Sequence, residues 1–151
     1  MSDHRATIHW QRTSADFIYD TYNRAHETRF KSGTIVLPSS SAPEFRGDPD
    51  RVDPEEAFVA SLSSCHMLTF LAICARKRLT VDAYEDDASG RLEKGEHGKL
   101  WMGHVTLRPR VRFAPGVTVS KATLDDIHHH AHEDCFIANS VTTQIGVESR
   151  E

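Results

Sequence analysis

Apolar and polar residues alternate along the first part of the chain, a pattern typical of β-strands that bury one face. Ala6, Ile8 and Trp10 alternate with polar residues and predict a strand over 6–11. Further extended segments are predicted over 17–22 and 34–37. The stretch 38–53, PSSSAPEFRGDPDRVD, is rich in Pro, Ser, Gly and Asp and predicts a loop.

A helix is predicted to begin at Asp53, which is a suitable N-cap residue. Pro54 fits the first helical position, and Glu56 stands where a capping box places its glutamate. The residues that follow are apolar on nearly every side, until basic residues begin at Arg76. Serines and His66 interrupt the apolar run, so we expect a helix buried in the protein core rather than a membrane span.

The second half of the chain returns to strands and ends in a helix and a strand. Strands are predicted over 81–92 and 101–113, with Trp101, Val105, Leu107, Val111 and Phe113 on one face. A helix is predicted over 120–134 and a last strand over 141–147. This order of elements predicts a single α+β domain over 1–151. In the second helix, one apolar stripe is expected to pack on the first helix, and it consists of Leu124, Ile127, Ala131 and Cys135.

Composition and charge narrow the range of partners. The chain has 151 residues, a formal net charge of -4 and an isoelectric point near 6.2. A nucleic-acid-binding protein would favour a basic surface, so no nucleic acid is expected. The first ten residues contain no apolar signal region, which predicts a cytoplasmic location without membrane attachment.

The three cysteines suggest either buried core residues or redox or metal chemistry. On one helix, Cys65 and Cys74 would point to opposite sides and lie roughly 13 Å apart along the axis. A disulfide needs α-carbons within about 7 Å, so these two cannot pair while the helix is intact. Cys74 is therefore expected in the core, and an intramolecular partner of Cys65 would have to be Cys135.

The segment IHHHAHEDC raises an alternative based on metal chemistry. His128 and His132 would share a helix face, with Cys135 close beyond them, which makes a candidate metal triad. The competing interpretation is a solvated polar face with one or two packed imidazoles. Because no companion ligand motif is evident apart from His66 beside Cys65, we expect no metal and no other cofactor.

Two motifs together resemble the OsmC/Ohr family of thiol peroxidases. The run DPEEAFVASLSSCHMLTF resembles the family helix that leads to the first cysteine, and CFIANSV resembles its second cysteine motif. The opening IHW resembles the first strand of the family. The resemblance is nearer to the OsmC-like branch. It implies an OsmC-like fold with antiparallel sheets wrapped around two central helices in an intertwined homodimer.

The resemblance also implies roles for particular residues. Cys65 resembles the peroxidatic cysteine, Cys135 the resolving cysteine and Glu55 the glutamate at the start of the family helix. Arg46 resembles the arginine of the OsmC branch, and Arg29 is the less favoured alternative. Candidate residues of a substrate pocket are Phe58, His66, Phe70 and Phe136.

The implied function is a dithiol-dependent peroxidase that reduces organic, and also inorganic, hydroperoxides. Cys65 would form a sulfenic acid and then a disulfide with Cys135, which a dithiol such as a dihydrolipoyl protein would reopen. Glu55 and Cys65 would lie about 15 Å apart on one helix, so a compact site would combine Arg46 and Glu55 of one subunit with both cysteines of the other. The alternative is a non-catalytic, stress-related protein of the same fold that binds a ligand or a metal.

Overall fold

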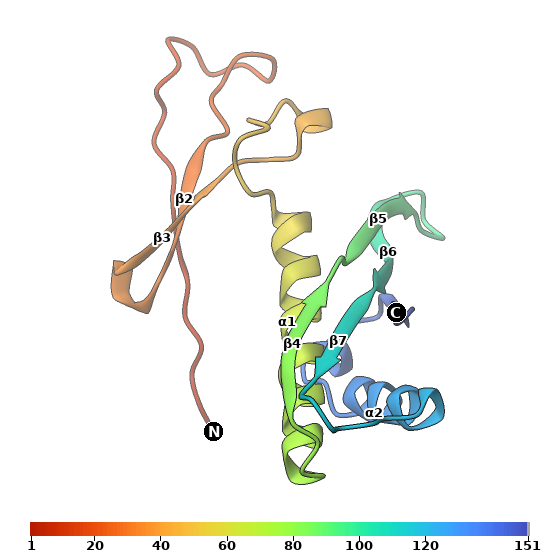
Figure 1. The fold of residues 1–151 in the computed structure, drawn as a ribbon. Helices are drawn as coiled ribbons and strands as arrows, with labels where there is room; N and C mark the ends of the chain where they lie inside the picture. Colours follow the sequence, from red (N-terminus) through yellow and green to blue (C-terminus); the bar gives the residue numbers. More distant parts are fainter. Residues whose placement is uncertain (151) are drawn as a thin grey trace. The chain divides into compact units, whose positions relative to one another are not determined.

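The computed structural model describes residues 1–150, and the chain divides into two compact units. The first unit is Met1–Ala57, and the second begins at Phe58 (Figure 1). The two units are described separately.

The first unit contains one antiparallel sheet of three strands in the order β1-β2-β3. Its strands are β1 (Thr7–His9), β2 (His26–Phe30) and β3 (Ile35–Ser39). The strand predicted over 17–22 is wrong. That segment turns back on itself, because the backbone N–H groups of Thr21 and Tyr22 both donate to the carbonyl of Ile18 and the Thr21 hydroxyl donates to Asp16. Two short 3-10 turns complete the unit, η1 (Lys31–Gly33) and η2 (Pro43–Phe45).

Helix α1 (Pro54–Arg76) begins with the predicted capping box. The Asp53 carboxylate accepts a hydrogen bond from the Glu56 backbone N–H at 2.7 Å, and the Glu56 carboxylate accepts one from the Asp53 backbone N–H at 3.1 Å. Beyond the helix, Arg78 adopts a left-handed conformation with φ 58°, and the N–H of Leu79 donates to the Cys74 carbonyl. These bonds satisfy backbone groups that the ends of the helix would otherwise leave without partners.

The expectation that α1 is buried on every side is wrong within the protomer. The buried residues form a stripe at four-residue spacing, and other faces carry exposed apolar side chains such as Leu68, which is 61% exposed. By length and composition alone, this 23-residue helix could cross a membrane, and 22% of its most apolar window is buried. The face of α1 that points away from the strands is therefore not covered by other residues of the protomer. The stripe consists of Leu62, His66, Phe70 and Cys74.

The second unit contains a long, interrupted antiparallel hairpin. Strand β4 (Val81–Asp86) pairs with β7 (Pro109–Phe113), and β5 (Ser89–Lys94) pairs with β6 (Leu100–Leu107). Each of the two long predicted strands is therefore divided in two. At the break, the Asp86 carboxylate accepts hydrogen bonds from the Arg108 backbone N–H at 2.6 Å and from the Ser63 hydroxyl at 2.5 Å. The last strand, β8 (Gln144–Val147), runs parallel to β6.

A bulge in β6 reverses the expected facing of its first residues. The pairing skips Gly103, since Arg91 faces His104 and Leu92 faces Met102. Met102 consequently packs against the core residues Val105 and Leu107, while Trp101 remains 37% exposed instead of sharing their face.

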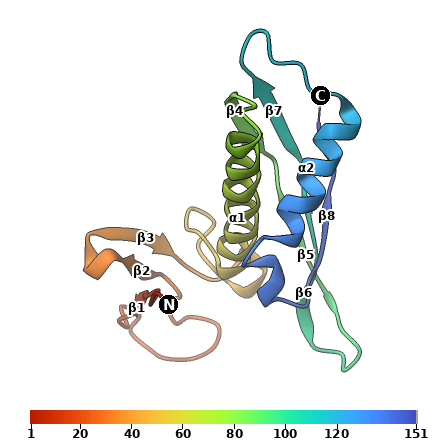
Figure 2. The ribbon, with the colours of Figure 1, turned by 90° about the horizontal axis from the view of Figure 1, so that it is seen from below.

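Helix α2 (Lys121–Glu133) lies beside α1, and both helices pack on the strands of the second unit (Figure 2). The Ser120 hydroxyl caps it by accepting a hydrogen bond from the Thr123 backbone N–H at 3.2 Å. Its predicted stripe packs on α1, because Ile127 and Ala131 form one core cluster with Phe70 and Cys74. This packing holds the helix that carries Cys65 against the helix that leads to Cys135.

Candidate functional site

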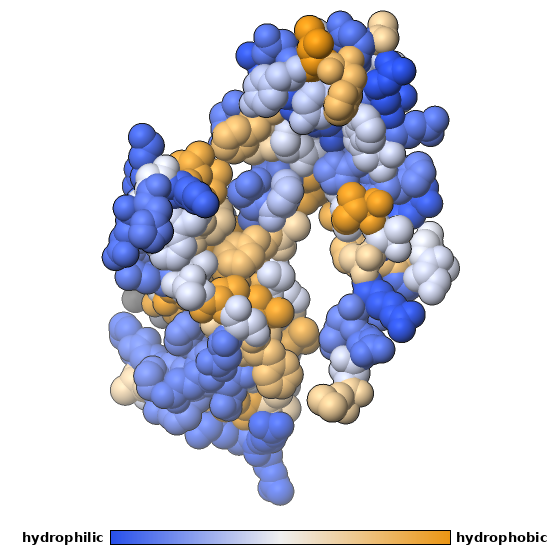
Figure 3. Space-filling view, turned by 180° about the vertical axis from the view of Figure 1, so that it is seen from behind, coloured by the Kyte–Doolittle hydropathy of each residue, from blue (hydrophilic) through white to orange (hydrophobic). Residues whose placement is uncertain are grey.

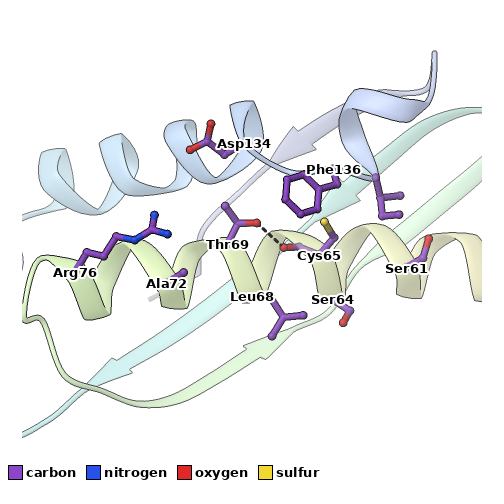
Figure 4. Close-up of a pocket in the computed structure, with 10 residues that line it drawn as sticks. Ser61, Ser64, Cys65, Leu68, Thr69, Ala72, Arg76, Asp134 and Phe136 are labelled. Atoms are coloured by element: carbon purple, nitrogen blue, oxygen red, sulfur yellow. Dashed lines mark hydrogen bonds between the residues drawn. The ribbon is translucent and has the colours of Figure 1, made fainter. Parts of the chain in front are cut away.

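Cys65 lies in the middle of α1 and is partly exposed. The Thr69 hydroxyl donates a hydrogen bond to the Cys65 carbonyl at 2.9 Å (Figure 4). The side chain borders an open pocket of about 620 Å³ between α1 and the segment that follows α2. Cys65 is thus a thiol that a small molecule can reach.

Cys135 follows the C-cap residue of α2 and is buried, with 1% of its surface exposed. The Ala138 backbone N–H donates to its Sγ at 3.4 Å, and the Asn139 backbone N–H donates to its carbonyl at 3.0 Å. The short 3-10 turn η3 (Ala138–Ser140) therefore closes around this cysteine. The turn fixes the Cys135 side chain at the end of α2.

The Cys65 and Cys135 side chains are close enough for the Cys65 thiol to influence the pKa of Cys135. Burial raises the pKa of the Cys135 thiol, and the neighbouring Cys65 thiol raises it further, while the N–H groups of Ala138 and Ile137 oppose the shift. The Cys135 thiol is therefore protonated at neutral pH. Cys74 is 1% exposed in the core, as expected, and burial raises the pKa of its thiol. All three cysteines are free thiols.

The pocket beside Cys65 differs from the one expected. Of the four predicted residues, Phe136 borders it and is 82% exposed, whereas Phe58, His66 and Phe70 pack in the core instead. The reason is angular, because His66 and Phe70 follow Cys65 by one and five positions and so point away from it on a helix. The prediction missed eight lining residues, of which all on α1 except Ser64 recur at helical spacing from Cys65, a signal present in the sequence. They are Ser61, Ser64, Leu68, Thr69, Ala72 and Arg76 on α1, with Asp134 and Ile137 after α2.

His66 belongs to a buried pair of imidazoles. Its Nε2 lies 3.0 Å from Nδ1 of His128, and the two rings stack with centroids 5.3 Å apart. The rings are 1% and 3% exposed, and burial lowers the pKa of each to about 4. Both rings are therefore neutral at pH 7, and one donates a hydrogen bond to the other.

The candidate arginines and Glu55 lie in the first unit. Arg46 forms an ion pair with Asp20 at 2.8 Å, and its backbone is left-handed with φ 62°. Arg29 binds the Glu27 carboxylate, with Nε at 2.8 Å, and this hydrogen bond lowers the pKa of Glu27. Glu55 lies in the first turn of α1. Among residues 1–150, neither arginine is ion-paired with Glu55 in the protomer.

The histidine-rich helix does not assemble the metal triad considered above. His128 and His132 border a pocket of about 290 Å³, and Cys135 is not part of its lining. Within the described residues, no three His, Cys, Asp or Glu side chains gather as metal ligands.

Comparison with known proteins identifies the family. A profile described as OsmC-like protein matches residues 47–150. An OsmC-like protein of unknown function from Vibrio cholerae is 42% identical, with a TM-score of 0.93 over 99% of this chain and 100% of the other. The chain belongs to the OsmC-like protein family.

More distant OsmC-like neighbours share the fold. An organic hydroperoxide resistance protein from Elizabethkingia anophelis has 17% identity and a TM-score of 0.72, over 99% of this chain and 94% of its own. The organic hydroperoxide resistance protein OhrB of Bacillus subtilis has 17% identity and a TM-score of 0.73, over 99% and 98%. At this identity they establish the OsmC-like fold, with its antiparallel sheets and two helices. No curated protein matches this OsmC-like chain.

Proposed function

We propose that this protein is a cytoplasmic thiol peroxidase that reduces organic hydroperoxides through Cys65 and Cys135. The observation that carries the proposal is the closeness of a reachable thiol, Cys65 at the border of a pocket, to a buried thiol, Cys135. The names of two structural neighbours, organic hydroperoxide resistance proteins, agree with this chemistry.

In the first step, the Cys65 thiolate attacks the terminal oxygen of the hydroperoxide. The O–O bond breaks, Cys65 becomes a sulfenic acid, and the alkoxide leaves and takes up a proton as the alcohol. Cys135 supports the attacking thiolate, because its raised pKa keeps it protonated and able to donate to sulfur.

In the second step, Cys135 closes a disulfide on the oxidised sulfur. The sulfur of Cys135 attacks Cys65, the S–O bond breaks, and the hydroxyl leaves with the thiol proton as water. The contact between the two side chains favours this reaction over attack by a second peroxide. An external dithiol, such as a dihydrolipoyl protein, then reduces the disulfide and restores both thiols.

An organic substrate suits the surroundings of Cys65. Leu68, Ala72, Phe136 and Ile137 give the pocket apolar walls, and about 620 Å³ exceeds the space that hydrogen peroxide needs. We therefore propose aryl or alkyl hydroperoxides as the preferred substrates.

We also propose a homodimer in which Arg46 and Glu55 of one subunit complete the site of the other. Exposed apolar side chains in the second unit, including Leu68 and Phe136, are part of an apolar surface that a second copy would cover (Figure 3). Near Cys65, the Arg46 guanidinium would stabilise the thiolate and the leaving alkoxide, and Glu55 would hold the guanidinium by a bidentate pair. Light scattering should then give twice the protomer mass of 17.0 kDa.

Thiol titration tests the proposed reaction. Reduced, untagged protein is treated with one equivalent of cumene hydroperoxide, and free thiols are counted before and after treatment. A peroxidase loses two of its three thiols per chain, and cumyl alcohol appears in equal amount. Retention of all three thiols with unchanged hydroperoxide would instead favour a non-catalytic binding protein.

A further inference from the structure

The His66–His128 pair joins α1, which carries Cys65, to α2, which leads to Cys135. Within residues 1–150, it is the sole side-chain hydrogen bond between α1 and α2, at 3.0 Å. His66 directly follows Cys65, and His128 stands seven residues, about two helical turns, before Cys135. The bond therefore connects the helices near the level of Cys65, about 10 Å along α2 from Cys135.

The pair has an energetic cost that plain packing would avoid. His66 Nδ1 and His128 Nε2 are both buried and lack a hydrogen-bond partner within the described residues. Phe70 stacks on His128 with centroids 4.4 Å apart, so the surroundings are apolar. Two apolar side chains would fill this space without buried, unpaired nitrogens. What the imidazoles add is a bond with a required distance and direction.

Disulfide closure is sensitive to the position of the two helices. Sulfur atoms bond only when the α-carbons lie within about 7 Å and the side chains face each other. The turn η3 fixes Cys135 to the end of α2, so a shift of α2 along α1 would carry the Cys135 sulfur with it. The first oxidation forms no covalent bond to Cys135 and is not subject to this requirement.

We propose that His66 and His128 are positioning residues that hold α1 and α2 in the register at which Cys135 closes a disulfide on Cys65. They do not touch the reacting atoms, and they act through the cysteines. The inference deepens the proposed function, since it concerns the second step of that reaction.

The test separates the hydrogen bond from the space that the rings fill. His66→Leu and His128→Leu remove the bond and keep an apolar side chain. His66→Gln and His128→Asn place an amide near the nitrogen that made the bond. His130→Leu serves as the control on the same helix, because His130 is exposed and its ring bonds only to its own helix. Circular dichroism and thermal melting identify any variant that fails to fold.

Disulfide closure is driven by diamide, a thiol oxidant, so that the measurement does not depend on peroxidase activity. We expect both Leu variants to close the Cys65–Cys135 disulfide about tenfold more slowly, the effect of about one net hydrogen bond. The amide variants should recover most of the rate, and His130→Leu should match the parent. With cumene hydroperoxide, the Leu variants should oxidise Cys65 at the parental rate and accumulate its sulfinic acid.

Two results would overturn the proposal. One is folded Leu variants that close the disulfide with diamide as fast as the parent. The other is amide variants that close the disulfide as slowly as the Leu variants, which would mean that the imidazoles act only by filling space. A parent that closes the disulfide with diamide but consumes no hydroperoxide would refute the peroxidase proposal alone.

Discussion

At the residue scale, Cys65 and Cys135 differ in exposure and should differ in the consequence of their loss. Cys65→Ser should abolish hydroperoxide consumption, because it removes the sulfur that attacks. Cys74→Ser should retain consumption, since Cys74 lies in the core away from the pocket. Peroxide assays with cumene hydroperoxide and a dithiol reductant compare the three proteins. Parental turnover by Cys65→Ser would refute the assignment.

Cys135→Ser tests the second thiol separately. We expect roughly one turnover per chain, after which Cys65 accumulates sulfinic and sulfonic acids because nothing condenses with its sulfenic acid. Mass spectrometry should show 32 or 48 Da added to the peptide that contains Cys65, as expected for about two or three oxygens. Sustained turnover without these additions would mean that another thiol resolves the sulfenic acid.

Single residues were predictable where helix geometry alone decided the outcome. The spacing along one helix separated Cys65 from Cys74, and the stripe on the second helix indicated the approach of Cys135 to Cys65. The same angular argument, applied to His66 and Phe70, would have placed them outside the pocket. Arg46 is different, since its partner depends on contacts between distant segments that periodicity does not encode.

At the element scale, the capping box of α1 offers a direct test of a predicted feature. Asp53→Ala should lower the free energy of unfolding by about 1 kcal/mol, because the Glu56 backbone N–H loses its acceptor. Urea unfolding followed by circular dichroism measures the change. Asp50→Ala, at an exposed position in the preceding turn, is the matched control and should change little. Equal effects of the two substitutions would contradict the capping role.

The helices, whose starts are marked by local capping residues, were predicted more accurately than the strands, whose bounds depend on pairing with distant segments. The caps at Asp53 and Ser120 set the starts of both helices, and both were predicted within one residue. The break between β4 and β5 depends instead on the bond from Arg108 to Asp86, 22 residues away. The bulge at Gly103 depends on its partner strand in the same way, so alternation placed Trp101 on the wrong face.

At the scale of the whole molecule, one protomer covers only part of the apolar surface of α1. Its sequence is apolar on nearly every side, yet only the stripe that faces the strands and α2 is buried. Periodicity could therefore predict that α1 is covered, but not whether the cover comes from the same chain. The proposed dimer accounts for the remainder, and it would also bring an arginine to the pocket beside Cys65.

The buried imidazoles should make the stability of the fold depend on pH in the mildly acidic range. Their folded pKa of about 4 lies below the ordinary value of 6.5, so the unfolded chain binds protons first as the pH falls. The contribution of a neutral, buried imidazole to the free energy of unfolding is thus fully present above pH 6.5. It is lost as the pH falls toward 4, and the loss is about 3 kcal/mol for one imidazole. His132 faces His66, and Asp125 and Asp86 face His128. The two carboxylates partly oppose the lowering of the His128 pKa.

Urea unfolding at several pH values between about 7.5 and 4.5 tests this prediction. The urea midpoint should fall steeply with decreasing pH for the parent and for His97→Gln, an exposed control, but little for the double variant His66→Leu/His128→Leu. The lowered pKa of Glu27 acts only below its ordinary value of 4.5, outside this window. An equally steep decline in the double variant would show that other groups cause the acid sensitivity.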